Sequence, residues 1–517
     1  MHVVLQTPEL LDEIFDHVPR HTLPSLARTC KSVFEPAARR IWKQSNTLIH
    51  LARCLPESCL DCGNYKAGDE MLNVEIKFTR PITAFDVQRV RIYAGFITFF
   101  DFLDSIVGLS PTNIAKLAAV VGGDVLLPNL RNLFCGGPSR FSAALPYLLS
   151  PVLCEVSICL GERNPNLADA ATDETYAMNL LKARGPASIT TLYLQADEDY
   201  PLAELLAGWD SLQKLNIFGD FDDVVLSAIA NLPALHTLGL QGRSRPLPVS
   251  VPTYWRAQAT MRSLLVSDAQ ITSALEYAHR FRSSPLEMIM ISSVPHSSQN
   301  ALRDLCHAIG QFDSVQSLRR VHISTDILDG SDLSALEDSP ACEMRDMEPL
   351  LAFHGLTALS VSPVRVLALH DEDVLRIAQA CPNLESLFLG CAKWHAPTLT
   401  ALSLVHLARH TPRLRDLSLT FDATDVSIPD GMTLPPPQLT LWTLYVIASP
   451  IESEYAVASF LSRLFLGLKW LRVYRPSQRD RDQAEVQRRK LWKRVEEALS
   501  YFAEARRTRF DGGGASV

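Results

Sequence analysis

Three cysteines and a histidine near residue 55 form the cluster in this sequence that most resembles a metal site. They are His50, Cys54, Cys59 and Cys62. The spacing of the three cysteines falls in the range used by some zinc and iron–sulfur sites. A helical register, however, places Cys54 on one face with Leu51 and Leu55, where a cysteine behaves as a small buried apolar residue. This second interpretation is the stronger one, so we predict no metal and no other cofactor.

A second candidate for chemistry is the acidic run Asp371-Glu372-Asp373, whose carboxylates would suit a cation site or an acid–base pair. The run stands where a helix should begin, and acidic side chains stabilise that end of a helix dipole. The sequence contains no Gly-x-Ser-x-Gly, no His-Glu-x-x-His and no Walker loop. We therefore predict that the chain has no catalytic residues and is not an enzyme.

The elements that position the side chains come from a repeated apolar signature. Leu-x-x-Leu-x-Leu, or its Ile/Val equivalent, occurs in fourteen copies. The copies start at residues 87, 130, 153, 189, 212, 235, 261, 286, 318, 356, 384, 414, 441 and 468. Their mean spacing of about 29 residues is typical of strand-plus-helix units that stack into a solenoid. We predict an α/β leucine-rich-repeat solenoid, with parallel strands on the concave face and helices on the convex face.

Two regularities separate this pattern from chance matches in a hydrophobic sequence. Proline stands two positions before the signature in five copies, at Pro128, Pro151, Pro233, Pro382 and Pro412. A proline there ends the preceding helix without removing a hydrogen bond from the strand ladder. Helix-period stretches such as Val224–Ile229 and Leu402–Leu407 lie between copies. The sequence therefore predicts alternating strands and helices.

Composition limits the classes of partner. The chain of 517 residues carries 49 basic and 57 acidic side chains, a net charge of −8, which argues against a dedicated nucleic-acid surface. Its first residues lack the pattern of a secretory signal, and no apolar run is long enough to span a bilayer. Its 11 cysteines form no even framework. We expect an intracellular protein, cytoplasmic or nuclear, without nucleic-acid or membrane partners.

The first 45 residues have a different pattern, which predicts a small helical module. Thr7-Pro8-Glu9 suits a helix start, and Pro19 should end that first helix. Its apolar face holds Leu10, Leu11, Ile14, Phe15 and Val18. Two more short helices should follow, the last ending near Trp42. So few residues bury too little surface to be stable alone, so their apolar faces must pack on the solenoid, on a partner, or on both.

These residues resemble the F-box family in order and spacing. The matching runs are Pro8-Glu9-Leu10-Leu11-x-x-Ile14-Phe15-x-x-Val18 and Leu23-x-x-Leu26-Ala27-x-x-Cys30-Lys31-x-x-Phe34. The usual Leu-Pro opening of the family is Thr7-Pro8 here. The resemblance implies docking on a Skp-type adaptor and, through it, on a cullin–RING ubiquitin ligase. It also implies that seven residues meet the adaptor or the module's own core: Pro8, Leu10, Leu11, Ile14, Leu23, Leu26 and Phe34.

Further boundaries follow from composition. We predict a connector over residues 46–80 with a strand at Leu72–Phe78, a solenoid over 81–475, a capping helix over 476–510 and a disordered tail over 511–517. The long gaps between copies at 87–130 and 318–356 leave room for insertions or degenerate repeats. Asp326–Met347, rich in Asp, Ser and Glu, is expected to be an exposed loop.

Side chains that alternate with the buried leucines should point outward from the concave sheet. Large apolar groups at these positions are candidates for a partner-binding surface. They are Phe134, Tyr193, Leu265, Met290, Phe388 and Tyr445, with Trp470 one strand position earlier in the last copy. An insertion or the terminal helix would cover several of them in the competing interpretation.

Two hypotheses of function remain open. In the first, the chain is a non-catalytic substrate-recognition adaptor that presents a bound protein for ubiquitylation. In the second, it is a protein-binding scaffold whose N-terminal helices only cap the solenoid. The sequence does not identify the target protein or the oligomeric state, and it leaves open whether a small-molecule cofactor fills the concave face.

Overall fold

The computed structural model describes residues 7–61, 76–102, 109–123, 125–135, 144–159, 178–183, 188–196, 202–219, 222–242, 259–294, 300–325, 341–363, 366–390, 396–429, 431–446, 449–473 and 483–512. The chain divides into two compact units. Unit 1 holds residues 1–236 and 255–257, and unit 2 holds residues 237–254 and 258–517.

Unit 1 begins with short helices and continues with strands and helices that alternate. Its helices are α1 (Pro8–Asp16), α2 (Leu23–Ala27), α3 (Lys31–Trp42), α4 (Ile49–Ala52), α5 (Gln88–Ala94), α6 (Pro111–Val121), α9 (Leu202–Leu206) and α10 (Asp223–Ala230). Single 3-10 turns lie at Arg20–Thr22, Glu57–Cys59 and Leu145–Tyr147. Its strands are β1 (Gln44–Ser45), β2 (Leu60–Asp61), β3 (Lys77–Phe78), β4 (Phe99–Phe102), β5 (Asn132–Cys135), β6 (Glu155–Cys159), β7 (Thr191–Gln195) and β8 (Lys214–Phe218).

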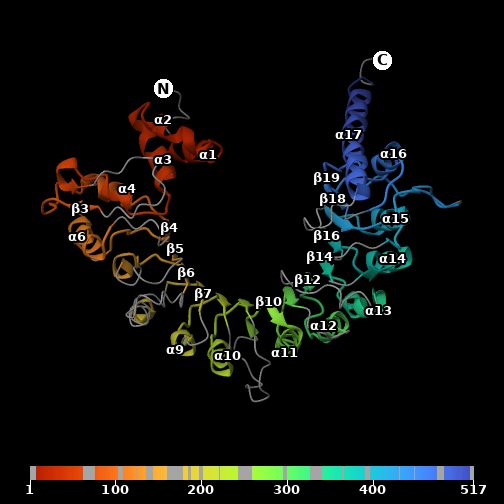
Figure 1. Cartoon of the computed structure of the whole chain (residues 1–517), viewed down its shortest axis with the longest axis horizontal. Coiled ribbons are helices and arrows are strands. Elements are labelled where there is room, and N and C mark those ends of the chain that lie inside the picture. The colour runs from red at the N-terminus through yellow and green to blue at the C-terminus, as the bar shows by residue number, and fades with distance from the viewer. Residues whose placement is uncertain are drawn as a thin grey trace. The chain divides into compact units, whose positions relative to one another are not determined.

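The main sheet of unit 1 is parallel, and its strands follow the chain. Strands β1, β4, β5, β6, β7 and β8 pair in that order. Burial alternates along β5 to β8, because every second side chain points to the helices and is fully buried. Figure 1 shows these strands on one side of the unit and helices such as α6, α9 and α10 on the other.

The copy of the signature at residue 87 is not a strand, which corrects the sequence-based prediction. Val87, Val90 and Ala94 are all fully buried, but on helix α5 and the residue before it. Their spacing of three and four residues is that of a helix face, while Ile92, the third apolar residue of the signature, is 51% exposed. The first strand of this repeat is β4, which lies inside the long gap between residues 87 and 130.

The predicted connector contains a small two-stranded sheet. Strand β3 pairs antiparallel with β2, joining Leu60 to Phe78 and Asp61 to Lys77. The strand expected at Leu72–Phe78 therefore exists at its last two residues, and residues 62–75 lie outside the described part of the chain.

Unit 2 repeats the same plan over a longer sequence. Its strands are β9 (Thr237–Gln241), β10 (Ser263–Gln270), β11 (Met288–Val294), β12 (Arg320–Thr325), β13 (Cys342–Glu343), β14 (Ala358–Ser362), β15 (Leu367–Ala368), β16 (Ser386–Leu389), β17 (Asp416–Leu419), β18 (Thr443–Val446) and β19 (Trp470–Val473). Its helices are α11 (Ile271–Arg280), α12 (Ala301–Gly310), α13 (Met344–Met347), a 3-10 turn at Glu348–Ala352, α14 (Asp371–Ala380), α15 (Ala401–His410), α16 (Glu454–Leu464) and α17 (Gln483–Gly512).

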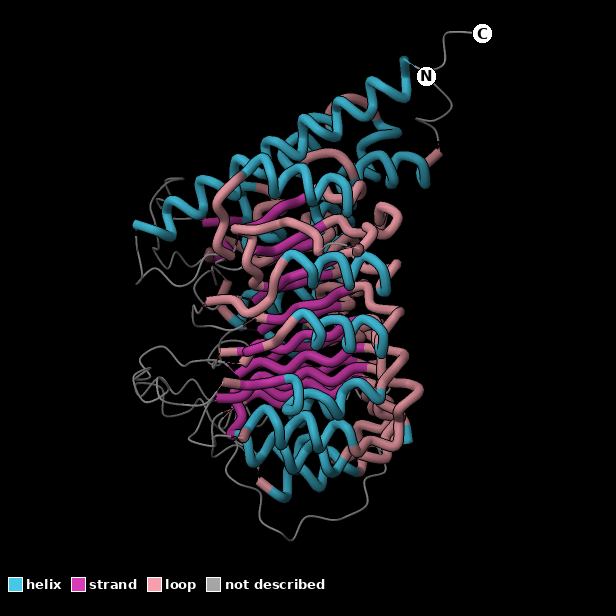
Figure 2. The backbone as a smooth tube through the Cα atoms, turned by 90° about the vertical axis from the view of Figure 1, so that its right-hand side faces the viewer, coloured by secondary structure: helices cyan, strands magenta, loops and turns pink. Residues whose placement is uncertain are grey.

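The main sheet of unit 2 is also parallel and nearly follows the chain. Strands β9, β10, β11, β12, β14, β16, β17, β18 and β19 pair in that order, and the leucine positions of neighbouring strands are in register. Figure 2 shows the strands lying side by side, with helices along one face. Thirteen of the fourteen predicted copies are thus strands, each beginning two residues after its first apolar residue. Both units are built as the predicted leucine-rich-repeat solenoid.

Helix ends explain why the turns between repeats are short. Pro382 and Pro412 follow directly after the C-caps of α14 and α15. At the other end, Ser453 and Thr400 accept backbone hydrogen bonds as N-caps of α16 and α15. These local signals stop each helix at the length that lets the next strand pair with the previous one.

The segment 326–347 is not wholly the exposed loop that its polar composition predicts. Its last residues form β13 and α13, and the side chains of Met344 and Met347 are buried. Asp346 in this segment binds Arg303 on α12 at 2.6 Å. Two methionines are enough to anchor the end of the segment, and residues 326–340 lie outside the described part of the chain.

Helix α17 covers the last repeat of unit 2. The side chains of Trp492 and Val495 are buried, and the Trp492 indole donates a hydrogen bond of 2.9 Å to the Ser449 carbonyl. The same ring meets Phe421 edge-on at 6.0 Å. These contacts hold α17 against the last repeats of unit 2. The helix runs on to Gly512, two residues into the predicted tail, and residues 513–517 lie outside the described residues. No helix in the described part of the chain combines the length and apolarity needed to cross a bilayer.

Candidate functional site

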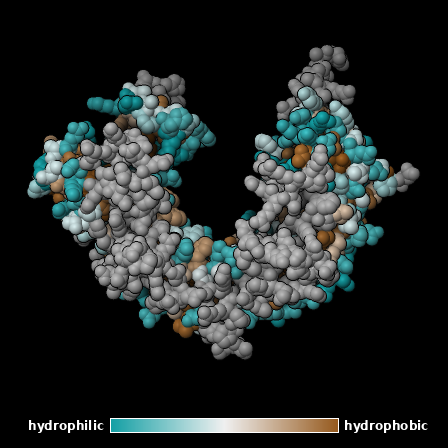
Figure 3. Space-filling model, in the orientation of Figure 1, coloured by the Kyte–Doolittle hydropathy of each residue, from teal (hydrophilic) through white to brown (hydrophobic). Residues whose placement is uncertain are grey.

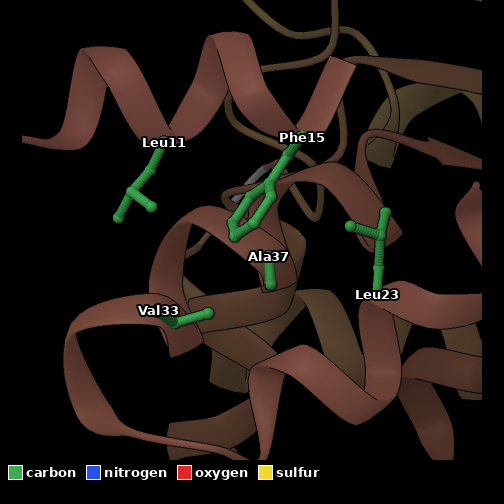
Figure 4. Close-up of a cluster of buried hydrophobic side chains, with 5 residues drawn as sticks. All are labelled: Leu11, Phe15, Leu23, Val33 and Ala37. Atoms are coloured by element: carbon green, nitrogen blue, oxygen red, sulfur yellow. The ribbon is translucent and has the colours of Figure 1, made fainter. Parts of the chain in front are cut away.

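The N-terminal module folds around a small apolar core. Five buried side chains from α1, α2 and α3 form it, and Figure 4 shows them converging. They are Leu11, Phe15, Leu23, Val33 and Ala37. Leu26 packs half-buried against this cluster. Leu11, Leu23 and Leu26 therefore belong mainly to the module's own core, one of the two roles that the F-box resemblance implied for them.

Three other predicted residues remain exposed on the same module. Leu10 is 41% exposed, Ile14 42% and Phe34 40%. Leu10 and Ile14 are four residues apart on α1, so they share one face of that helix. Pro8 is the first residue of α1, where its fixed φ suits a helix start, although Thr7 makes no side-chain capping bond. Hydrophilic colours prevail among the described residues on the face that Figure 3 shows. Large apolar side chains are exposed elsewhere as well, for example Phe85 at 78% and Leu439 at 67%.

Polar and aromatic contacts attach the module to the repeats of unit 1. The Trp42 ring stacks on Tyr93 of α5 at 4.7 Å between ring centroids. The Lys43 carbonyl accepts hydrogen bonds from the Thr98 and Phe99 amides, and β1 pairs with β4. The module therefore covers the edge of the first strands, as a cap would, while Leu10, Ile14 and Phe34 stay uncovered.

The candidate partner-binding residues of the solenoid lie on the strand face away from the helices. Phe134, Tyr193, Leu265, Met290 and Phe388 are all half-buried. Phe134 stacks on Phe99 of the neighbouring strand at 5.0 Å, and the Lys214 ammonium lies 5.1 Å from the centre of the Tyr193 ring. Contacts with neighbouring strands thus take up part of the surface that these side chains would otherwise expose.

The last two strands of unit 2 expose more. Tyr445 on β18 is 36% exposed, and Trp470 on β19 is 54% exposed. Sequence reasoning missed Trp442, which precedes β18 and is 46% exposed. The signal was present, because Trp442 follows directly after the signature leucine Leu441. A side chain at that position lies at the rim of the sheet and not in the core.

Cations accompany these exposed aromatic rings. The Arg415 guanidinium lies 5.7 Å and the Lys469 ammonium 4.8 Å from the Trp442 ring centre. Arg472 lies 5.3 Å from the centre of the Trp470 ring. We call these six residues the C-terminal patch: Arg415, Trp442, Tyr445, Lys469, Trp470 and Arg472.

The described residues of the two clusters that suggested metal or acid–base chemistry make structural contacts. Burial raises the pKa of the Cys54 thiol to about 11, and its Sγ donates to the His50 carbonyl at 3.3 Å. Asp371 binds the backbone amide of Thr400 at 2.9 Å, and Asp373 closes a capping box with His370. Cys62 lies outside the described residues. In the described part of the chain no group of His, Cys, Asp or Glu side chains is placed to hold a metal ion.

Comparisons with known proteins agree with the N-terminal geometry. An F-box domain model matches residues 7–33. No curated protein matches the chain. Among solved structures, the chain is similar to one in the yeast Rad7–Elc1 complex, at 13% identity and a TM-score of 0.36, over 92% of this chain and 90% of that one.

Two further solved structures are similar to the chain at lower scores. One is a leucine-rich-repeat protein of Leptospira interrogans, at 12% identity and a TM-score of 0.23, over 76% of this chain and 99% of that one. The other is a TDR receptor, at 12% identity and a TM-score of 0.28, over 74% of this chain and 60% of that one. The F-box match and the register of the strands define the class: the chain combines an F-box domain with a leucine-rich-repeat solenoid.

Proposed function

We propose that this chain is a non-catalytic substrate-recognition adaptor. Its F-box docks on a Skp-type adaptor and thereby on a cullin–RING ligase, and its solenoid holds a protein for ubiquitylation. The site of action is then intracellular, cytoplasmic or nuclear, because that ligase works there. The partners are proteins, and neither nucleic acid nor a membrane is part of the proposal.

One observation carries the docking half of the proposal. The module exposes Leu10, Ile14 and Phe34 although its own core is already formed by other residues. Burying a Leu, Ile or Phe side chain contributes about 1.5–3 kcal/mol, and these three are partly buried already, so each offers the lower part of that range. Leu10 and Ile14 supply a hydrophobic face of α1, and Phe34 adds an exposed ring on α3, which are groups of the kind that a helical adaptor would cover.

The target-binding half of the proposal rests on the side chains that lie on the strand face away from the helices. Phe134, Tyr193, Leu265, Met290 and Phe388 supply half-buried anchors, and Tyr445 and Trp470 supply exposed ones. Aromatic and methionine side chains are common anchors of protein interfaces. The identity of the target depends on the combined shape of this row and its loops, so it remains to be found by experiment.

A second function is favoured by two contacts between the module and the first repeat. The stacking of Trp42 on Tyr93 and the pairing of β1 with β4 are what a pure cap of the solenoid requires. In that case the chain is a scaffold that never meets the ligase. The exposed face of α1 favours docking over this alternative, because a pure cap has no need of uncovered Leu10 and Ile14.

Adaptor co-purification tests the proposal. We expect the Leu10→Asp/Ile14→Asp variant to lose the Skp-type adaptor when both are co-expressed, because two charges cannot be buried in an apolar interface. The matched control is Val224→Asp/Val315→Asp, which changes two exposed valines, one on α10 and one between α12 and β12. This control should retain the adaptor at the wild-type yield.

Circular dichroism must show both variants folded, since the four positions are exposed. If the Leu10/Ile14 variant still retains the adaptor at full yield, the docking assignment is wrong. If the wild-type chain binds no adaptor at all, the scaffold function replaces it.

A further inference from the structure

We propose that the C-terminal patch binds an extended acidic peptide segment of the partner protein. This inference rests on the proposed function, since it names the chemical class of the segment that the solenoid holds. It concerns one part of unit 2, whereas the proposed function left the whole row of strands as the candidate surface.

Strand register brings the six residues together. Residues Thr443 and Tyr445 of β18 stand beside Trp470 and Arg472 of β19. The Trp442 amide donates to the Arg415 carbonyl at 2.8 Å, and the Lys469 amide donates to the Trp442 carbonyl at 2.9 Å. Neighbouring strands are about 4.8 Å apart, so the patch spans roughly 10 Å across three strands. An extended peptide of three or four residues covers such a width.

The cations are held in place by the rings. Trp442 lies between Arg415 on one neighbouring strand and Lys469 on the other, and Arg472 lies near Trp470. Each cation rests near the negative face of a ring, which restricts the rotamers of a long side chain. Binding an anion then orders fewer side chains, so less conformational entropy is lost on association.

The cations of the patch outnumber the acidic side chains beside it. None of Arg415, Lys469 and Arg472 lies within salt-bridge distance of an acidic group among the described residues. Two acidic residues border the patch, Glu385 beside Arg415 and Asp416 on β17, against three cations. The chain as a whole carries a net charge of −8, so this local excess of positive charge is a property of the patch. Charge complementarity therefore favours an acidic ligand.

An acidic peptide fits better than a nucleic acid. Single-stranded nucleic acids bind by stacking bases on free aromatic faces. Both neighbours of Trp442 in the row are cations that lie near its ring, and Arg472 lies near the ring of Trp470, so a base would have to compete with these cations for the ring faces. The edges of the rings and the exposed Tyr445 can still contact an apolar side chain. The patch thus suits a segment of Asp and Glu residues around one apolar residue.

Fluorescence anisotropy with the full-length chain and its co-expressed adaptor tests this. The probe is a labelled 12-residue peptide of alternating Glu and Gly with one central Leu, and the same peptide with Gln for Glu is the neutral comparison. We expect the acidic peptide to bind at least tenfold more tightly than the neutral one. The Arg415→Gln/Lys469→Gln/Arg472→Gln variant should lose at least tenfold of that affinity, and higher salt should weaken binding to the wild type.

The matched control variant is Arg262→Gln/Arg319→Gln/Arg320→Gln. These exposed arginines precede or begin β10 and β12 in the same sheet, outside the patch. The control removes the same net charge, so it should bind the acidic peptide as the wild type does. Thermal unfolding of both variants should match the wild type, since all six positions are at the surface.

Several results overturn the inference. They are no binding of the acidic peptide, equal binding of the two peptides, an unchanged affinity in the patch variant, an equal loss in the control variant, or tighter binding of a labelled dT12 oligonucleotide. If one of these results is found while the patch variant still co-purifies with the adaptor, only the peptide-binding inference fails and the proposed function stands. The Leu10→Asp/Ile14→Asp variant, in turn, should keep its affinity for the peptide.

Discussion

The N-terminal module and the C-terminal patch both expose large apolar side chains, but the side chains that surround these groups differ in charge. Leu10, Ile14 and Phe34 are plain hydrocarbon groups on helices. Trp442 precedes β18 and Trp470 begins β19, and each ring has a cation of the chain near it. The first surface suits a partner that brings an apolar face, and the second suits one that brings negative charge.

The two regions also differ in how they are supported. The module has a core of five side chains, of which one is aromatic. The last repeat is covered by α17, whose Trp492 is fully buried, bonded to Ser449 and packed edge-on against Phe421. A small core buries little apolar surface, so its stability depends strongly on each side chain. The N-terminal module should therefore be more sensitive to substitution than the last repeat.

The largest expected effect comes from the core of the module. Phe15→Ala should cost about 3–5 kcal/mol and unfold the three helices, because the cavity removes the central ring of a five-residue cluster. Leu10→Ala, on the exposed face, should change stability by less than about 0.5 kcal/mol. Hydrogen exchange of the amides of residues 8–42 measures the stability of the module in each variant. Equal protection in the two variants would contradict the assignment of Phe15 to the core and of Leu10 to the exposed face.

A smaller effect is expected beside the patch, at Gly467. A Cβ added there would lie 2.0 Å from the Leu439 carbonyl oxygen, so the loop before β19 would have to move away from the loop before β18. We expect Gly467→Ala to cost about 1–3 kcal/mol and to weaken peptide binding, because Lys469 and Trp470 follow directly. Urea unfolding and the anisotropy assay measure the two effects. Gly122→Ala, which meets no atom within 4 Å, is the matched control.

The smallest expected effect depends on pH and concerns the segment that precedes α5. The Arg80 guanidinium, together with the Thr83 hydroxyl and amide, holds the pKa of the Asp86 carboxyl well below its usual range. A carboxyl with a lowered pKa stabilises the fold above its unfolded pKa of about 4, and this contribution is lost as the pH falls further.

Asp86→Asn should therefore lower the urea midpoint most at pH 7, and by less, but still clearly, at pH 3, because the folded carboxyl stays ionised there while the unfolded one is largely protonated. The comparison of the two midpoints at both pH values measures this. A difference that stays constant with pH would show that packing, and not the charge, makes Asp86 important.

The sequence predicted the strands well because each repeat carries its own local signals. The leucines of a copy such as Leu414-x-x-Leu417-x-Leu419 alternate with polar residues, and Pro412 ends the helix before them. Strand pairing follows from this repetition, since each unit buries its apolar face only against its neighbours. The module was predicted for a similar reason, from apolar residues at helical spacing.

Other features depend on contacts that spacing alone does not encode. Val87 and Val90 fit a helix face and a strand signature equally, and only packing against the neighbouring helices decides between them. Met344 and Met347 anchor a segment whose composition is polar. Trp442 becomes part of a surface because Arg415 and Lys469, 27 residues away on either side, are brought beside it by strand register.

Hydrogen exchange of the full-length chain, with and without a purified Skp-type adaptor, tests the central claim most directly. The adaptor should slow the exchange of amides in α1 and α3 of the F-box module and leave strands β18 and β19 unchanged. No slowing in α1, or equal slowing in β18 and β19, would contradict the account of two surfaces that serve two different partners.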